Sequence, residues 1–237
     1  MRIASALVIA AALLAAAPAA AQKAPSGFTS IFNGKDLSGW RGRQPNYNPA
    51  EEAKLTKEEL AEKQAKWNAE RDAHWRVDTE KKEIVSDGNN PHLATVKDYG
   101  DFEFHVDWLM VSPNGDSGIY LRGIPQVQIW DPSNPREVRN GAEKGSGALW
   151  NNRADSPGRF PLVKADKPVG EWNNLKIRMV GEKVWVWLND QLTVDGQVMH
   201  NFFDRTGATP VPARGPIELQ THGSEIRFRN IYIKELP

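Results

Sequence analysis

The stretch from Gly115 to Asp131 constrains the fold more than any other part of this chain. It reads GDSGIYLRGIPQVQIWD, two alternating runs of apolar and polar residues separated by a break at Gly123 to Pro125. Because successive strand residues point to opposite faces, a hairpin of the two runs has one apolar face and one polar face. The apolar face holds Ile119, Leu121, Val127 and Ile129. The polar face holds Tyr120, Arg122, Gln126 and Gln128, which suit either a hydroxyl-rich ligand or an ordinary solvated surface.

Similar short runs recur along the chain between turn residues. The strongest, Phe102 to Val111, alternates large apolar residues with Glu103, His105 and Asp107. The other expected strands cover residues 28–32, 74–77, 82–86, 93–96, 172–179, 184–188, 192–194, 217–221 and 225–233. Many short strands without alternating helices predict an antiparallel sandwich or barrel.

One helix is expected, over about residues 56–73. Thr56 is a good N-cap, and Glu59 three residues later completes a capping box. The apolar stripe is sparse, with Leu60 and Trp67 as its large members. This pattern indicates a surface helix inserted in a loop and held to the sandwich through Trp67, with a functional lid as the alternative.

Composition excludes several classes of protein. The formal net charge is zero and no basic stripe is present, which argues against a nucleic-acid partner. The chain has no cysteine, so thiol catalysis, disulfides, iron–sulfur clusters and cysteine-bound zinc are excluded. The phosphate-binding loop, the dinucleotide fingerprint and the HExxH motif are absent from the sequence. Asp116 and Ser117 are expected to close a turn.

The first 21 residues resemble a secretory signal peptide. Arg2 is the positively charged start, an apolar run follows, and Ala19 to Ala21 offer small residues for cleavage. We therefore expect a signal peptide over 1–21, a linker over 22–27 and a single domain over 28–237. The mature protein is expected to be periplasmic or secreted, without stable membrane insertion and monomeric.

The polar faces of several strands could converge on one concave sheet. They supply Glu103, His105, Asp107, Tyr120, Arg122, Gln126, Gln128, Glu218, Gln220 and His222. Such a set could hold a divalent metal ion, with His105, Asp107 and His222 as ligands, or divide into a general acid and a general base. The need for a cofactor stays open. Trp130 and, in the long irregular region 132–161, Trp150 and Asn151 are candidate sugar contacts.

Eight ordered motifs carry a family resemblance. They are NGKDLSGW, DFEFHVDW, GDSGIYLRG, PQVQIWD, GEWNNLKIRM, VWLND, GPIELQTHG and FRNIYIKEL. Together they resemble the 3-keto-disaccharide hydrolase domain over about Phe28 to Leu236. The resemblance implies a concanavalin A-like jelly-roll sandwich of two antiparallel sheets. Many family members carry a glutamate at the position of Gln126, so a role of that carboxylate does not transfer.

The resemblance also implies a chemistry. A keto group at carbon 3 of a pyranose acidifies the hydrogen on carbon 2, so a base can remove it and the enolate can expel the glycosidic oxygen. Under this reading His222 is the base or a metal ligand, with Asp107 as the alternative carboxylate. Arg122 stabilises the enolate or orients a hydroxyl. Tyr120 is an acid or a platform. The sugar contacts are Gln126, Gln128, Glu218, Gln220, Trp130, Trp150 and Asn151.

Two functions follow from these observations. The first is cleavage of an oligosaccharide or glycoside substrate, and the alternative is a non-catalytic carbohydrate-binding module. Strand parity further predicts that His222 lies within about one side-chain length of Asp107 and Arg122.

Overall fold

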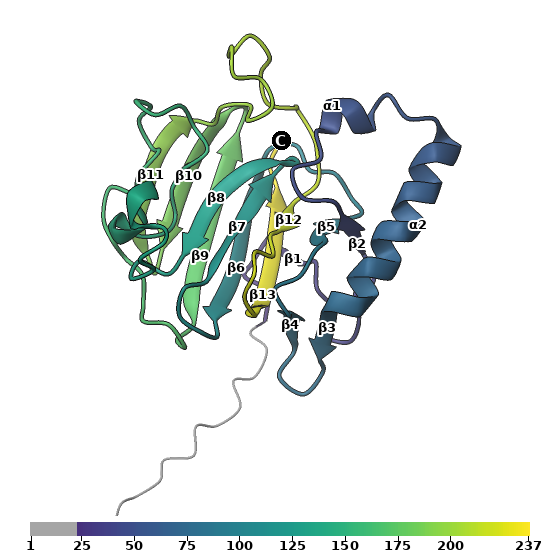
Figure 1. The fold of residues 1–237 in the computed structure, drawn as a ribbon, viewed down its shortest axis with the longest axis horizontal. Helices are drawn as coiled ribbons and strands as arrows, with labels where there is room; N and C mark the ends of the chain where they lie inside the picture. Colours follow the sequence, from purple (N-terminus) through teal and green to yellow (C-terminus); the bar gives the residue numbers. More distant parts are fainter. Residues whose placement is uncertain (1–22) are drawn as a thin grey trace, which may run out of the picture.

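The computed structural model describes residues 23–237, and the expected signal peptide over 1–21 lies outside these residues. Two antiparallel sheets stack face to face in a jelly-roll sandwich (Figure 1). The large sheet has the order β11 (Gln191–Val198), β10 (Lys183–Leu188), β9 (Asn173–Val180), β6 (Phe102–Met110), β13 (Ile226–Glu235), β4 (Glu83–Ser86) and β3 (Trp75–Asp78), with β1 (Thr29–Ser30) also pairing with β13. The small sheet has the order β2 (Trp40–Arg43), β5 (His92–Thr95), β12 (Glu218–Leu219), β7 (Asp116–Leu121) and β8 (Ile124–Trp130).

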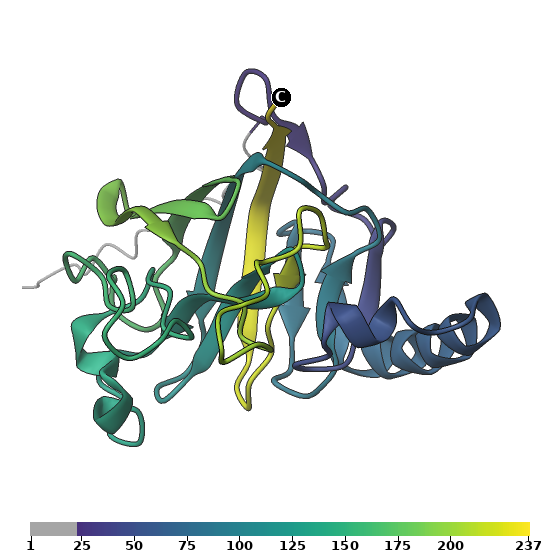
Figure 2. The same ribbon diagram turned by 90° about the horizontal axis from the view of Figure 1, so that it is seen from above.

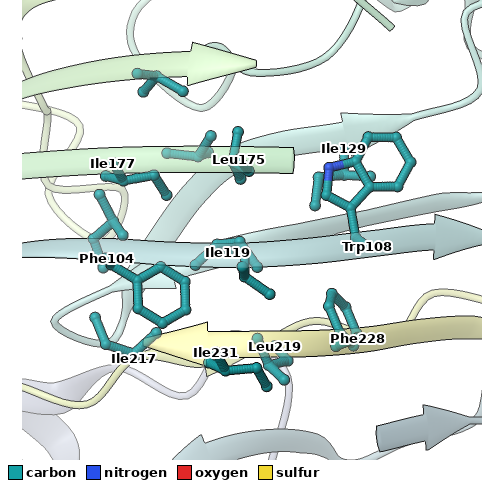
Figure 3. Close-up of a cluster of buried hydrophobic side chains, with 14 of the residues drawn as sticks. Phe104, Trp108, Ile119, Ile129, Leu175, Ile177, Ile217, Leu219, Phe228 and Ile231 are labelled. Atoms are coloured by element: carbon teal, nitrogen blue, oxygen red, sulfur yellow. The ribbon is translucent and has the colours of Figure 1, made fainter. Parts of the chain in front are cut away.

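The core lies between the two sheets and is built by strand alternation. In β6 every second residue from Phe102 to Met110 is buried, and the residues between them are half-buried. The same alternation sends Ile119, Ile129 and Leu219 of the small sheet inward (Figure 3). Because each strand must bury its apolar set, its polar set is directed away from the opposite sheet.

The segment after β2 forms a wall beside the small sheet. It contains α1 (Pro49–Glu52) and α2 (Lys57–His74), and the capping box of Thr56 and Glu59 is present. Trp67 is the buried residue of α2 and meets Tyr47 edge-on at 5.1 Å between ring centroids. The short 3-10 helices η1 (Val138–Asn140) and η2 (Ala142–Lys144) lie at the other end of the molecule (Figure 2).

Gly42 sets how closely α2 approaches the sheet. A Cβ atom at Gly42 would lie 2.1 Å from the backbone oxygen of Trp67. The Asn68 side chain also accepts a hydrogen bond from the Gly42 backbone N–H at 3.0 Å. The helix is therefore docked closely on the backbone of β2, which favours a fixed element over a mobile lid.

Replacing Gly42 with alanine is expected to lower the free energy of unfolding by about 1–3 kcal/mol, because overpacking forces α2 away from β2. Gly100 is a matched control, since its added Cβ would meet the flexible end of the Arg214 side chain at 3.0 Å. Urea unfolding of both variants checks this. A Gly42→Ala protein as stable as Gly100→Ala would contradict the proposed docking.

Two expectations about elements were wrong. Residues 40–43 form strand β2 at the edge of the small sheet, although they are not among the strands expected from the sequence. Asp116 begins strand β7 opposite Trp130 and does not close a turn. The helices described in residues 23–237 include none that is long and apolar enough to cross a membrane.

Candidate active site

The outer face of the small sheet gathers most of the polar residues predicted from the sequence. Pairing places Glu218 opposite Tyr120 on one side and opposite Ala94 on the other. It also places Arg43 opposite His92 and Gly118 opposite Gln128. Most side chains of this face are buried although they point away from the core: Arg43, His92, Tyr120, Gln126, Gln128, Glu218 and Gln220. Neighbouring segments therefore shield the face from solvent.

A buried ion-pair network occupies the end of this face near α1. Arg43 donates to Glu218 Oε1 through Nη1 at 2.6 Å and to Glu52 Oε2 through Nη2 at 2.6 Å. Burial would raise the pKa of the Glu218 carboxyl, but the positive charge of Arg43 and the contact with His92 outweigh it and lower the pKa. Glu218 is therefore ionised at neutral pH, and the inserted segment completes the network through Glu52.

A hydrogen-bonded chain of four side chains crosses the rest of the face. Gln126 donates to Gln128 Oε1 at 2.6 Å, and Gln128 donates to Asp116 Oδ1 at 2.6 Å. The other oxygen of Asp116 lies 3.0 Å from His222 Nδ1. The hydrogen bond to Asp116 raises the pKa of the His222 imidazole, while partial burial opposes the shift. Gly118 makes room for the chain, because a Cβ there would lie 2.4 Å from Gln126 Oε1.

Four buried polar atoms on this face have no hydrogen-bond partner among the described residues. They are His92 Nδ1, Gln126 Oε1, Glu218 Oε2 and Gln220 Oε1. His92 Nδ1 and Glu218 Oε2 are 3.5 Å apart. Buried polar groups are nearly always paired with protein or with ordered water, so this cluster marks a place where water or a ligand binds. Three of the four are oxygen acceptors, which match the hydroxyl donors of a sugar.

Aromatic residues frame the face without offering an open stacking platform. Tyr120 is 2% exposed and donates its hydroxyl to Asn46 Oδ1 at 2.9 Å. Burial, together with the charges of Glu218 and Asp116, raises the pKa of Tyr120, so the hydroxyl stays protonated. Trp130 is also 2% exposed and meets the half-buried Trp150 edge-on.

The prediction that His222 lies beside Asp107 was wrong. Asp107 and His105 belong to β6 of the large sheet, whereas His222 follows β12 of the small sheet. Asp107 points to the outer face of the large sheet and accepts from Asn174 and Asn230. Alternation separates core from surface, but it does not say which of the two sheets a surface belongs to.

The predicted place of Arg122 was also wrong. Arg122 has φ of 54° and lies with Gly123 in the turn that joins β7 to β8. Its buried guanidinium donates to Asp101 Oδ1 at 2.7 Å and to the backbone oxygens of Gly100 and Pro212. Strand parity ends where the strand ends, so the turn directs Arg122 away from the Gln126 side chain. Arg122 therefore ties loops together and does not face His222.

The suggested metal ligands do not meet either. His105 and Asp107 are on one side of the sandwich and His222 is on the other. Within residues 23–237, no three histidine or acidic side chains are grouped closely enough to hold a metal ion. The set of His105, Asp107 and His222 is thus not a single centre.

Sequence reasoning missed three residues of this face. Arg43 was assigned to a loop, Asp116 to a turn, and His92 was not considered. The alternation of His92 with Leu93 carried the signal for His92, because Leu93 is fully buried in the core.

Asn151, proposed from its sequence neighbours, has a buried Oδ1 without a partner among the described residues.

Comparison with known protein families identifies the family of this chain. The sequence profile of the 3-keto-alpha-glucoside-1,2-lyase-like domain matches residues 27–234. The chain belongs to this family. The resemblance inferred from the eight motifs is therefore confirmed, and the family is one of carbohydrate-active, glycosyl hydrolase-like proteins.

Individual relatives are distant. A 3-keto-disaccharide hydrolase of Bacteroides thetaiotaomicron is 24% identical, over 89% of this chain and 79% of that protein. A crystal structure of a candidate glycosyl hydrolase from Parabacteroides distasonis superposes with a TM-score of 0.61 at 22% identity, covering 89% of this chain and 94% of that one. A second structure from the same organism gives a TM-score of 0.55 at 22% identity, with 88% and 99% covered. These two structures support the jelly-roll sandwich of the family.

Proposed function

We propose that the outer face of the small sheet is the active site of an enzyme that cleaves 3-keto-glycosides. The observation that carries this proposal is the His222–Asp116 pair beside the cluster of unpaired buried acceptors. The family supports a glycoside as the substrate class. The proposal includes secretion by a signal peptide over 1–21, which stays a prediction.

His222 is assigned as the general base. Asp116 accepts from Nδ1, which leaves the lone pair of Nε2 available to a substrate. The His222 side chain is 62% exposed, so a ligand can reach it without displacing a packed group. Nε2 removes the proton from carbon 2 next to the ketone, and the electron pair moves into the enolate.

The same histidine can then act as the acid. Its imidazolium, stabilised by Asp116, donates the proton to the glycosidic oxygen as the bond from carbon 1 to that oxygen breaks. The product is an unsaturated ketone, and water adds to its double bond to give the keto-monosaccharide. One imidazole serves as both base and acid, because the hydrogen that it removes from carbon 2 and the glycosidic oxygen that it protonates on carbon 1 are attached to neighbouring carbons.

The unpaired acceptors are assigned to substrate binding. Gln126 Oε1, Gln220 Oε1 and Glu218 Oε2 accept hydrogen bonds from sugar hydroxyls, and Gln128 holds Gln126 and Asp116 in place. Trp150, which is half-buried, is assigned to the rim of the site. Tyr120 and Trp130 are assigned to its walls, because their rings are almost completely covered.

Incubation of the purified protein with a panel of 3-keto-disaccharides tests the proposed function, with the unoxidised disaccharides as controls. Release of keto-monosaccharide from at least one linkage, and none from the controls, is expected. Tight calorimetric binding of the unoxidised sugars without turnover of any keto-sugar would contradict the proposal and favour a carbohydrate-binding module.

A further inference from the structure

A second pocket lies on the opposite side of the sandwich, on the outer face of the large sheet. Its volume is about 550 Å³, and strands β6, β9 and β13 form its floor while Lys167 and Trp172 border it. Ligand sites in proteins commonly have volumes of about 300–1,000 Å³. The proposed active site is on the other sheet, so this pocket is separate from it.

A bulge in β13 shapes the pocket. Arg229 pairs with Asp107 and Tyr232 pairs with His105, so the register skips between the two pairs. Asn230 within the bulge has φ of 52°, a left-handed conformation. Bulges redirect side chains and are frequent beside functional sites. Here the bulge brings Asn230 and Arg229 together around Asp107.

Asp107 is a positioning group for this cluster. Its Oδ1 accepts from Asn174 Nδ2 at 2.8 Å, and its Oδ2 accepts from Asn230 Nδ2 at 2.7 Å. Arg229 Nε is 3.6 Å from Oδ2, which is an ion pair without a direct hydrogen bond. Asp107 thus accepts hydrogen bonds from two neutral amides and none directly from Arg229.

Arg229 contributes its guanidinium to the lining of this pocket. Its side chain is 18% exposed and lies over the Trp172 ring, with 3.9 Å between the guanidinium carbon and the ring centroid. Its buried Nε has no hydrogen-bond partner among residues 23–237. A shielded guanidinium over an indole ring can bind a carboxylate, which accepts two parallel hydrogen bonds.

We propose that this pocket is a second, non-catalytic binding site for an acidic sugar. Arg229 binds the carboxylate of a uronic acid residue, and Lys167 adds positive charge at the same pocket, whereas Lys176 is paired there with Asp190. The amide of Asn174 and the edge of Trp172 border the space for the sugar ring and its hydroxyls. The site is independent of the proposed function, because none of these residues belongs to the small sheet.

Titration of the full-length mature protein with D-glucuronate, followed by the indole N–H signals in NMR, tests the site. The Trp172 signal, assigned with a Trp172→Phe variant, is expected to shift on addition of glucuronate. Arg229→Gln is expected to weaken binding about tenfold or more, because it removes charge-assisted hydrogen bonds. Arg229→Lys keeps the charge but loses the planar fork, so an intermediate affinity is expected.

Arg178→Gln is the matched control. Arg178 also faces outward from the large sheet, lies over Trp185 at 5.9 Å and is paired with Glu103, but it does not line the pocket. Binding should be unchanged in this variant, and thermal unfolding confirms that each variant is folded.

Three outcomes would overturn the proposal. One is the absence of a Trp172 shift at millimolar glucuronate. Another is equal affinity of the Arg229→Gln and wild-type proteins. The third is equal binding of glucose or of inorganic phosphate, because glucose lacks the carboxylate and phosphate lacks the sugar.

Discussion

Replacing His222 with alanine is expected to lower kcat on a 3-keto-disaccharide about a hundredfold to ten-thousandfold, the usual contribution of a positioned acid–base group. Stability should change little, because the side chain is 62% exposed. Steady-state kinetics and urea unfolding of the same preparation measure both quantities. Full activity in the variant would remove His222 from the mechanism.

His74→Ala is the matched control for this experiment. His74 Nδ1 lies 2.9 Å from Asp87, so this residue forms a second histidine–aspartate pair with a half-buried imidazole. It ends α2 and is outside the proposed site. Activity of His74→Ala should equal that of the wild-type protein. A loss as large as that of His222→Ala would show that the effect does not come from the proposed base.

The pH profile distinguishes a base from a structural histidine. His222 must be neutral to accept a proton, so kcat/KM is expected to fall as the pH drops through the pKa of His222, which Asp116 raises. Asp116→Asn removes the carboxylate that raises the pKa of His222. The fall of kcat/KM at acidic pH should therefore occur at a lower pH in this variant, and kcat should also be lower. The effect of pH on stability has the opposite direction. The His222–Asp116 pair stabilises the fold fully below the pKa that His222 has in the unfolded chain, and this contribution to the free energy of unfolding is lost as the pH rises through the pKa of His222 in the folded protein.

Replacing Arg43 with alanine is expected to lower the free energy of unfolding by about 3–5 kcal/mol, because it leaves a buried carboxylate without its partner. Glu218 is fully buried, and Arg43 supplies its shortest ion pair at 2.6 Å. In the wild-type protein the pKa of Glu218 is lowered by folding. The ionised carboxylate therefore contributes to the free energy of unfolding above the pKa of Glu218 in the unfolded chain, and this contribution is lost as the pH falls through its pKa in the folded protein. Urea unfolding at neutral and acidic pH measures both effects.

Two further variants test whether the loss of stability in Arg43→Ala comes from leaving the buried Glu218 carboxylate unpaired. Arg178→Ala removes a half-exposed partner of Glu103 and should cost about 0–1 kcal/mol. The double variant Arg43→Met with Glu218→Leu should be more stable than Arg43→Ala, because it removes the buried charge together with its partner. A double variant that is less stable would contradict the view that Glu218 is costly when unpaired.

Local patterns predicted the parts of the fold that local physics determines. Alternation placed Ile119, Leu121, Val127 and Ile129 in the core, and each is fully buried. The capping box at Thr56 is present because its two hydrogen bonds join residues three apart. The family motifs added the jelly-roll topology, which alternation alone could not choose over a barrel.

The site was predicted in part, because it depends on pairing between distant strands. Glu218, Gln220, Gln126, Gln128 and Tyr120 share one outer face as parity indicated. Asp107 was assigned to the wrong sheet, since parity carries no information on sheet membership. Arg43 was missed because a four-residue edge strand containing a glycine gives little periodicity.

The fate of the hydrogen on carbon 2 tests the account most directly. The reaction is run in deuterium oxide with a 3-keto-disaccharide, and the released keto-monosaccharide is examined by mass spectrometry and proton NMR. A sample without enzyme and one with His222→Ala correct for spontaneous exchange. Proton abstraction followed by elimination and hydration predicts one solvent deuterium at carbon 2 of each released keto-monosaccharide. If the wild-type enzyme released keto-monosaccharide that retains the original hydrogen at carbon 2, the proposed mechanism of proton abstraction and elimination would be contradicted.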